Sequence, residues 1–244
     1  MAEINNKYPY GGNNAADNSG VMTYVSICYA GARSTQDIEH NGLTLNGVGN
    51  GTTIENIYVL ESADDAIEFF GGTVNVKNLL AVNPDDDMFD FTQGYCGTLS
   101  NCYGIWESDY TSTEADPRGI EADGNFDGLY PNHLRQSDFV VDGMTIVNNA
   151  ANTTDNVDRM QDVIKIRRGA KATIKNALVK GTGGAIDLVD MNDGKGAGNA
   201  ASTISITNSL QLTGKKLNGE AVLNEAGSNT GADTSVFGWT KYNF

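Results

Sequence analysis

The 244-residue sequence lacks several features that would each indicate a common class of protein. No apolar run approaches the roughly 18 residues that a membrane-spanning helix needs. The first ten residues, MAEINNKYPY, lack the basic and apolar regions of a signal peptide, so we expect none within this chain. Long Ala/Glu/Lys/Leu stretches are also absent, whereas β-branched residues and Gly/Asn turns recur, and this composition favours a β protein.

Positive charge is scarce. Lys and Arg number 16 against 31 Asp and Glu, so the formal net charge is −15. Such an acidic chain is a poor partner for nucleic acid or for an anionic membrane surface, because their phosphates carry charge of the same sign. We therefore expect no nucleic-acid partner and no membrane insertion, and we expect an affinity for cations.

Cysteine and histidine are also few. The cysteines are Cys28, Cys96 and Cys102, and the only histidines are His40 and His133. No CxxC pair or His cluster indicates a zinc site. The segment YCGTLSNCYG leaves two interpretations of its cysteines open: a Cys96–Cys102 disulfide, or small buried hydrophobic side chains.

What the sequence does contain is an internal repeat. The stretches AIEFFGGTVNVKNLLAVNPDDD, MFDFTQGYCGTLSNCYGIW and VIKIRRGAKATIKNALVKGTGG each hold a short alternating strand, a glycine turn, a second strand, an asparagine and a third strand. The steps from Ile67 to Phe89 and from Ile164 to Ile186 are both 22 residues. A rung of this length is the unit of a parallel β-helix. We therefore predict an all-β fold: a single right-handed parallel β-helix domain, or solenoid, over residues 1–244, with about seven rungs.

Asparagine recurs between the second and third strands of the repeat. Asn tolerates the left-handed backbone of a tight bend, and stacked Asn side chains can hydrogen-bond to one another. We therefore predict an Asn ladder, with Asp142 in the corresponding slot of a longer rung. Its expected members are Asn56, Asn78, Asn101, Asn176 and Asn208.

Alternation within the first strand of each rung predicts which residues form the core. The inward positions are Leu43, Leu45, Ile67, Phe69, Phe89, Phe91, Ile120, Ile164, Ile166, Ile186 and Leu188. No single rung can bury this face alone, so stability is expected to come from stacking.

The outward positions predict a column of charge, because strands of successive rungs lie about 4.8 Å apart. One such column comprises Thr44, Glu68, Asp90, Glu121, Lys165 and Asp187. Neighbouring carboxylates disfavour one another's ionisation unless a cation, a Lys or Arg, or a raised pKa relieves the repulsion. Because Ca²⁺ is suited to clustered oxygen ligands, we predict a calcium site at Asp65, Glu68, Asp87 and Asp90. A ladder of salt bridges and a merely solvated acidic face remain as alternatives.

The segment from Glu107 to His133 interrupts the repeat twice, and we predict an inserted loop beside the acidic column. Long loops without repeats commonly carry function. Its aromatic residues, Tyr110 and Tyr130 among them, have two interpretations: stacking surfaces for sugars, or side chains that pack the loop onto the sheet.

The motifs DDAIEFFGGTVNVKNLLA, DDDMFDFTQGYCG, GIEADG and IRRGAKATIKNALV resemble a family of secreted or surface-anchored β-helix proteins of Bacteroidetes and marine proteobacteria, mostly without assigned activity. The resemblance covers nearly the whole chain. It implies an extracellular or cell-surface location, and it implies that this chain is a fragment of a longer helix. Further rungs upstream would then stack on its first rung. Residues 231–244 are expected to form a C-terminal cap over the last rung.

Pectate-lyase-like enzymes share this architecture by analogy, and they place calcium-binding carboxylates and a basic catalytic residue on an outward strand. The analogy implies Lys165 and Arg167 as candidate catalytic bases, although the Gly-His-Gly motif of polygalacturonases is absent. The residues expected to contact a ligand are His40, Tyr110, Glu121, Asp123, Tyr130 and Arg168.

The sequence thus favours a module that binds a divalent cation, with Ca²⁺ expected, and a carbohydrate polymer such as a polysaccharide or other surface glycan. One alternative is a calcium-dependent polysaccharide lyase, in which a base removes a proton next to a uronate carboxylate. The other is a structural or adhesive stalk without a ligand.

Overall fold

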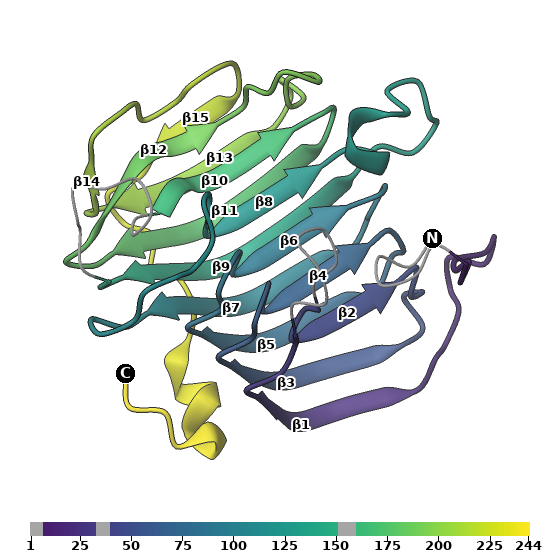
Figure 1. Ribbon diagram of the computed structural model, residues 1–244, viewed down its shortest axis with the longest axis horizontal. Helices are drawn as coiled ribbons and strands as arrows, with labels where there is room; N and C mark the ends of the chain where they lie inside the picture. Colours follow the sequence, from purple (N-terminus) through teal and green to yellow (C-terminus); the bar gives the residue numbers. More distant parts are fainter. Residues whose placement is uncertain (1–6, 33–39, 151–159) are drawn as a thin grey trace.

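Two parallel sheets face one another across a single core, and this arrangement confirms the predicted right-handed parallel β-helix (Figure 1). The computed structural model describes residues 7–32, 40–150 and 160–244. The larger sheet contains β1 (Val21–Cys28), β3 (Thr53–Leu60), β5 (Asn75–Val82), β7 (Thr98–Trp106), β9 (Asp138–Asn148), β11 (Lys171–Lys180), β13 (Thr203–Asn208) and β15 (Val222–Glu225).

The smaller sheet carries the first strand of each rung. It contains β2 (Leu43–Asn46), β4 (Ile67–Phe70), β6 (Phe89–Thr92), β8 (Ile120–Asp123), β10 (Met160–Arg167), β12 (Gly184–Asp190) and β14 (Gln211–Leu212). Two short 3₁₀ helices complete the fold, η1 (Phe126–Gly128) and η2 (Thr234–Thr240). Neither they nor any other helix in the described ranges is long and apolar enough to cross a membrane.

The second and third strands predicted for each rung form one strand that bends at the asparagine. Asn56, Asn78, Asn101 and Asn176 all have φ between 51° and 58°, in the left-handed region where Asn is tolerated. The amide of Asn78 donates to Oδ1 of Asn56 at 2.9 Å, and the amide of Asn101 donates to Oδ1 of Asn78 at 2.9 Å. The ladder is therefore real over these three rungs.

Three predicted members of the ladder are wrong. Asn176 keeps the left-handed bend, but its side chain bonds to Thr230 and Gly231 rather than to another asparagine. Asp142 lies opposite Ser100, so the slot beside Asn101 falls to Gly143, whose φ is 73°. A glycine fits this backbone without a Cβ penalty but offers no amide, so the ladder stops there. Asn208 is displaced because the pairing of β11 with β13 shifts register, and its side chain instead accepts a hydrogen bond from the Leu210 amide at 3.0 Å.

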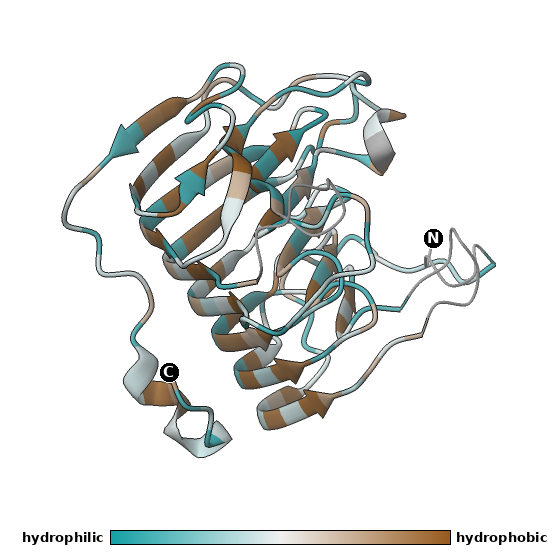
Figure 2. Ribbon diagram, turned by 60° about the vertical axis from the view of Figure 1, so that its left-hand side comes forward, coloured by the Kyte–Doolittle hydropathy of each residue, from teal (hydrophilic) through white to brown (hydrophobic). Residues whose placement is uncertain are grey.

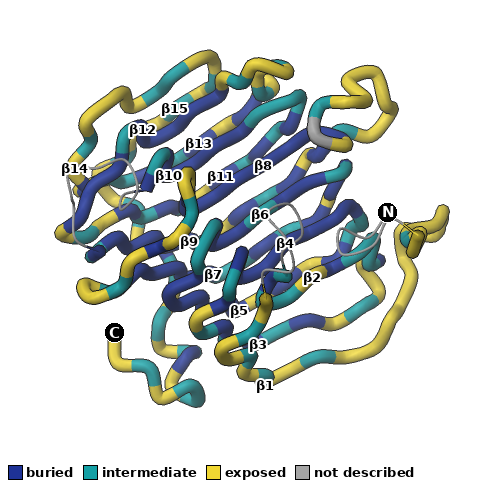
Figure 3. The backbone as a smooth tube through the Cα atoms, viewed as in Figure 1, coloured by how far each residue is buried: buried dark blue, intermediate teal, exposed yellow. Residues whose placement is uncertain are grey.

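The core consists of inward side chains stacked rung upon rung, visible as the alternating brown bands of Figure 2 and the buried strand interiors of Figure 3. Phe69, Phe91 and Phe139 form a continuous stack with ring centroids 5.1 and 4.1 Å apart. Each is fully buried, which contributes about 1.5–3 kcal/mol per side chain. All the predicted core positions are buried except Leu43, in the first described rung of this sheet, and Ile186, which are half-buried.

The half-burial of Ile186 reflects an error in the predicted register. β10 and β12 pair with a step of 25 residues, Ile164 with Val189, rather than with the step of 22 that would join Ile164 to Ile186. The rung is three residues longer than the predicted repeat of 22. The apolar pattern of AIDLVDM accommodates either register, so alternation alone could not choose between them.

Of the two interpretations of YCGTLSNCYG, the Cys96–Cys102 disulfide is wrong, since both cysteines are free. Cys102 points into the core from β7 and is fully buried, whereas Cys96 is exposed in the turn that precedes this strand. Side chains on opposite sides of the sheet cannot be bridged without moving the backbone.

We had expected the C-terminal segment to cover the last rung, but it does not. From β15 it runs back along the outside of the larger sheet toward the first rungs (Figures 1 and 2). Oδ1 of Asn176 accepts from the Thr230 amide at 2.8 Å, and Oδ1 of Asn101 accepts from the Asp233 amide at 2.6 Å. Phe237 in η2 is then buried against outward apolar residues of β5 and β7, and this apolar outer face explains why the segment lies there.

The edge of the first rung is open among the described strands. β1 pairs only with β3, and its inward residues Met22, Val25 and Ile27 are half-buried, whereas their counterparts in β3 are buried. The stacking of further rungs on this edge stays a prediction.

We expect Asn78→Ala to destabilise the fold by about 2–4 kcal/mol. The substitution removes two side-chain hydrogen bonds worth about 1 kcal/mol each. It also places alanine in the left-handed backbone region, which alanine tolerates less well than asparagine. Asn78→Gly loses the same bonds but suits the backbone, so it should cost less than the alanine variant. Chemical denaturation measures both, and equal stability of Asn78→Ala and the wild-type protein would contradict a structural ladder.

Candidate functional site

The outward face of the smaller sheet carries a pair of charged side chains in each of five successive rungs, at positions i and i+3. We call this set the acidic strip. It comprises Asp65 and Glu68, Asp87 and Asp90, Arg118 and Glu121, Asp162 and Lys165, and Asp187 and Asp190. Eight of its members are carboxylates and two are cations.

Strand pairing stacks these residues into two adjacent columns. In one column the Asp87 amide donates to Oδ1 of Asp65 at 2.9 Å. In the other, Glu68 lies opposite Asp90, and Asp90 lies opposite Glu121. The predicted vertical alignment of the acids is thus present in this half of the strip. The expected place of Asp187 beneath Lys165 is wrong, since Lys165 pairs with Asp190 and Asp187 pairs with Asp162.

The first half of the strip forms a square of four carboxylates, Asp65, Glu68, Asp87 and Asp90, from the rungs of β4 and β6. Carboxylate oxygens of Asp65, Glu68 and Asp90 lie within 4.8 Å of one another, and so do those of Asp87, Asp90 and Glu121. Asp65, Asp87 and Asp90 form no ion pair with any residue in the described ranges. These are the four residues predicted as metal ligands.

Two oxygens of this square are buried without a hydrogen-bond donor. Oδ1 of Asp87 and Oδ1 of Asp90 are shielded from solvent and accept no hydrogen bond from the described part of the chain. Asp87 as a whole is only 2% exposed. A buried carboxylate oxygen without a partner is costly, and a bound cation would relieve that cost.

The environment raises the pKa values of three of these acids. Burial, followed by the nearby Asp64 and Asp90, raises the pKa of Asp65 well above 3.8. Burial and acidic neighbours likewise raise the pKa values of Asp87 and Asp90. Full ionisation of the square is therefore unfavourable, and protons or a bound cation would relieve the repulsion.

In the second half of the strip, Lys and Arg side chains balance the acids. Lys165 Nζ pairs with Asp190 and lies 3.7 Å from Asp162. Arg118 pairs with Glu121 and lies 2.7 Å from Asp116. Although Asp162, Asp187 and Asp190 also bring oxygens within 4.8 Å of one another, the Lys165 ammonium already lies beside two of them. The predicted ladder of salt bridges thus describes this half of the strip.

The two candidate bases are both bound to carboxylates. Arg167 pairs with Glu121 and lies 3.2 Å from Asp123. Burial alone would lower the pKa of Arg167, but Glu121 and Asp123 raise it above its ordinary value. The Arg167 guanidinium therefore releases its proton even less readily than a free arginine, and the neutral form that could act as a base is disfavoured. Lys165 is 9% exposed, and its ammonium group is held in ion pairs with Asp162 and Asp190.

The three consecutive aspartates, Asp85 to Asp87, play three different roles. Asp85 holds the segment between β7 and β8: its Oδ1 accepts from the Thr113 backbone amide at 2.8 Å and from the Tyr110 hydroxyl at 3.1 Å. Asp86 groups with Asp64 and Asp65, whereas Asp87 groups with Asp90 and Glu121. The triplet joins the loop to the acidic strip.

The remaining predicted ligand residues are dispersed. Asp123 lies 3.3 Å from Arg168, which also lies 3.1 Å from Asp193. Tyr130, in the segment between β8 and β9, is 55% exposed, and its ring packs edge-on against Phe126. His40 is half-buried just before β2 and belongs to none of the possible metal groups in the described ranges.

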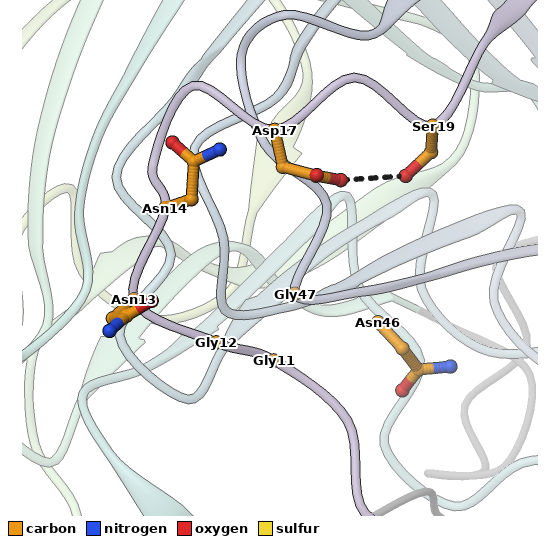
Figure 4. A pocket seen from close by; sticks show the side chains of 8 residues that line it. All are labelled: Gly11, Gly12, Asn13, Asn14, Asp17, Ser19, Asn46 and Gly47. Atoms are coloured by element: carbon orange, nitrogen blue, oxygen red, sulfur yellow. Dashed lines mark hydrogen bonds between the residues drawn. The ribbon is translucent and has the colours of Figure 1, made fainter.

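A separate polar pocket of about 320 Å³ lies between the N-terminal segment and the turn after β2 (Figure 4). Its only carboxylate, Asp17, accepts a hydrogen bond from Ser19 at 3.1 Å. None of the predicted site residues lines this pocket, so we place the candidate site on the acidic strip.

Replacing Lys165 with Met should destabilise the protein by about 3–5 kcal/mol at neutral pH, because it leaves buried aspartates without their counter-charge. Added Ca²⁺ should recover part of that loss if the lysine takes the place of a cation. Thermal unfolding in chelator and in Ca²⁺ measures both effects. A Lys165→Met variant as stable as wild type in chelator would show that the second half does not depend on this pair.

The comparisons with known proteins agree with this architecture. The family described as "Pectate-lyase like beta helix domain" matches residues 1–241. No curated protein and no solved structure matches the chain. Because the match spans nearly all of the sequence, the chain belongs to the family of pectate-lyase-like β-helix domains.

Proposed function

We propose that this protein is an extracellular β-helix module that binds Ca²⁺ on the acidic strip and a carbohydrate polymer beside it. The observation that carries the proposal is the square of Asp65, Glu68, Asp87 and Asp90, with shielded and unpartnered oxygens on Asp87 and Asp90. Membership of a pectate-lyase-like family supports the carbohydrate part.

The donor set fits calcium. Ca²⁺ takes 6–8 oxygen ligands at about 2.3–2.6 Å, so two of its ligands are at most about 5 Å apart. The carboxylate oxygens of each group lie within 4.8 Å of one another, so one Ca²⁺ could contact all three members of a group. Hard carboxylate oxygens without His or Cys favour Ca²⁺ or Mg²⁺ over zinc, and a square of acidic side chains from two rungs suits the flexible geometry of Ca²⁺.

A bound ion would serve two purposes here. It would remove the repulsion between stacked carboxylates and so stabilise the rungs of β4 and β6. With ligand positions left open, it would also attract oxygen atoms of a polysaccharide. The alternative of a calcium-dependent lyase loses support, because Lys165 and Arg167 are both held in ion pairs.

We expect Asp90→Asn to distinguish the repulsion between the carboxylates of the square from their binding of a cation. In chelator the variant should melt at a higher temperature than wild type, because one repelling carboxylate is gone. Added Ca²⁺ should raise the free energy of unfolding of this variant little, whereas it should raise that of wild type by about 2.7 kcal/mol when the ion is present at about 100 times its Kd. Calorimetric titration with CaCl₂ measures the affinity directly.

The matched control is Asp109→Asn, which removes one charge from an exposed position outside the strip. It should leave the calcium response intact. If wild type shows no thermal shift and no heat of binding with CaCl₂ or MgCl₂, the cation site is refuted.

Stability should also depend on pH in a way that Ca²⁺ reverses. The raised pKa values of Asp65, Asp87 and Asp90 mean that the folded protein keeps protons that the unfolded chain releases above pH 3.8. Their contribution to stability is therefore present below pH 3.8 and lost as the pH rises. Asp162, in the second half of the strip, follows the same trend, and its contribution is lost through about pH 6, the value to which burial raises its pKa.

In chelator we expect the melting temperature to fall between about pH 4 and neutral pH. With excess Ca²⁺ the ion replaces the protons, so the stabilisation by calcium should grow over the same range. A calcium effect that is equal at acidic and neutral pH would argue that the ion binds elsewhere.

A further inference from the structure

Beside the acidic strip lies an open groove of about 290 Å³ that neither the repeat nor the family match explains. It is lined by Tyr29, Ala30, Gly31, Glu61, Ser62, Ala63, Asn83, Asp85 and Tyr110. Ala63 and Asp85 directly precede Asp64 and Asp86, which group with Asp65 on the strip. The groove and the candidate cation site therefore share the same turns.

The floor of the groove is a second bend column of the β-helix. Tyr29, Glu61 and Asn83 have φ of 55°, 51° and 53°. The amide of each donates at 2.8 Å to a carbonyl of the next rung. Stacked rungs therefore present an aromatic ring, a carboxylate and a carboxamide one after another along the helix axis.

Tyr29 has an unusual combination of exposure and backbone strain. A bulky residue at positive φ is disfavoured, whereas glycine or asparagine is not. Its side chain is 71% exposed, and it makes no ring contact and no side-chain hydrogen bond with another described residue. Strain of this kind without a packing reason is typical of functional positions.

Tyr24 on β1, the strand that ends just before Tyr29, provides the contrast. It has the same φ of 55°, but its ring packs edge-on against Trp239 at 5.6 Å. Packing of the C-terminal segment thus accounts for Tyr24, whereas nothing in the described fold accounts for Tyr29.

The opposite wall and the floor are held in place. The Tyr110 hydroxyl donates to Asp85 at 3.1 Å, so its ring is fixed beside the groove. The Asn83 side chain donates from Nδ2 to Oε2 of Glu107 at 2.9 Å, and its Oδ1 accepts from the backbone N–H of Glu107 at 2.9 Å. Glu61 is exposed and can accept hydrogen bonds from a ligand.

We propose that this groove is a saccharide subsite, in which Tyr29 stacks against the face of a sugar ring and Glu61 accepts hydrogen bonds from its hydroxyls. The proposal rests on the carbohydrate binding proposed above and names its ligand class. Pockets for small ligands combine aromatic walls with a few polar groups, and tyrosine offers a large rigid surface with a polar tip. None of the lining residues is cationic, and two are acidic. The subsite therefore takes a neutral sugar rather than a uronate.

The test is affinity electrophoresis of the full chain in Ca²⁺, in gels that contain galactan, xylan, mannan, β-glucan or polygalacturonate. Wild type should be retarded by at least one neutral polysaccharide. Tyr29→Gly should weaken that retardation about tenfold or more, and its melting temperature should equal or exceed that of wild type because glycine suits the positive φ. Loss of binding together with a gain in stability is an outcome that a merely structural tyrosine would not give.

Tyr24→Gly is the matched control, since it makes the same change at the same φ outside the groove, and it should bind as wild type does. Equal retardation of Tyr29→Gly and wild type would overturn the subsite and leave the proposed function standing. Retardation by polygalacturonate alone would overturn the neutral-sugar assignment. If no polysaccharide retards wild type, the carbohydrate part of the proposed function fails as well.

Discussion

Repulsion between carboxylates stacked at the spacing of parallel strands is the constraint on which the outward face of this protein depends. A parallel β-helix places equivalent residues of successive rungs about 4.8 Å apart, whatever their charge. The core benefits from this geometry, since phenylalanine stacks on phenylalanine. The same geometry brings aspartate next to aspartate outside. Each rung must therefore compensate its acids, and the two halves of the strip do so differently.

The second half uses side chains as its counter-charges. Arg118, Lys165 and Arg167 each lie against carboxylates of their own or an adjacent rung. The first half has no such partners for Asp65, Asp87 and Asp90 among the described residues, and their pKa values rise instead. An ion in the first half would make the two halves equivalent. On this interpretation, Lys165 does permanently in one part of the strip what Ca²⁺ does reversibly in the other.

Much of this arrangement could be predicted from the sequence, and its failures have a common cause. Regular 22-residue spacing predicted the fold, the stacking of Glu68 on Asp90 and the first three ladder asparagines correctly. It failed where a rung is longer or the register shifts, as at Asp187 and Asn208. Alternation cannot detect such shifts, because a short apolar pattern fits more than one register. A stronger signal was present: the charged pair at i and i+3 recurs in five rungs and would have aligned Asp190 with Lys165.

Features that depend on contacts far apart in the sequence were beyond such reasoning. The C-terminal segment lies on β5 and β7 because their outward residues are apolar, yet nothing local to residues 231–244 indicates that destination. The role of Asp85 as the anchor of a loop is similar, since its partners lie 25 and 28 residues away. The groove at Tyr29 became visible only once three rungs were stacked.

The central claim is that a cation belongs in the square of carboxylates, and its most direct test is a crystal structure with a lanthanide in place of Ca²⁺. Anomalous scattering would locate the ion without ambiguity. The account requires a peak bounded by Asp65, Glu68, Asp87 and Asp90, at about 2.3–2.6 Å from oxygens of both rungs. A square filled only by water, or a peak solely among Asp162, Asp187 and Asp190, would contradict it.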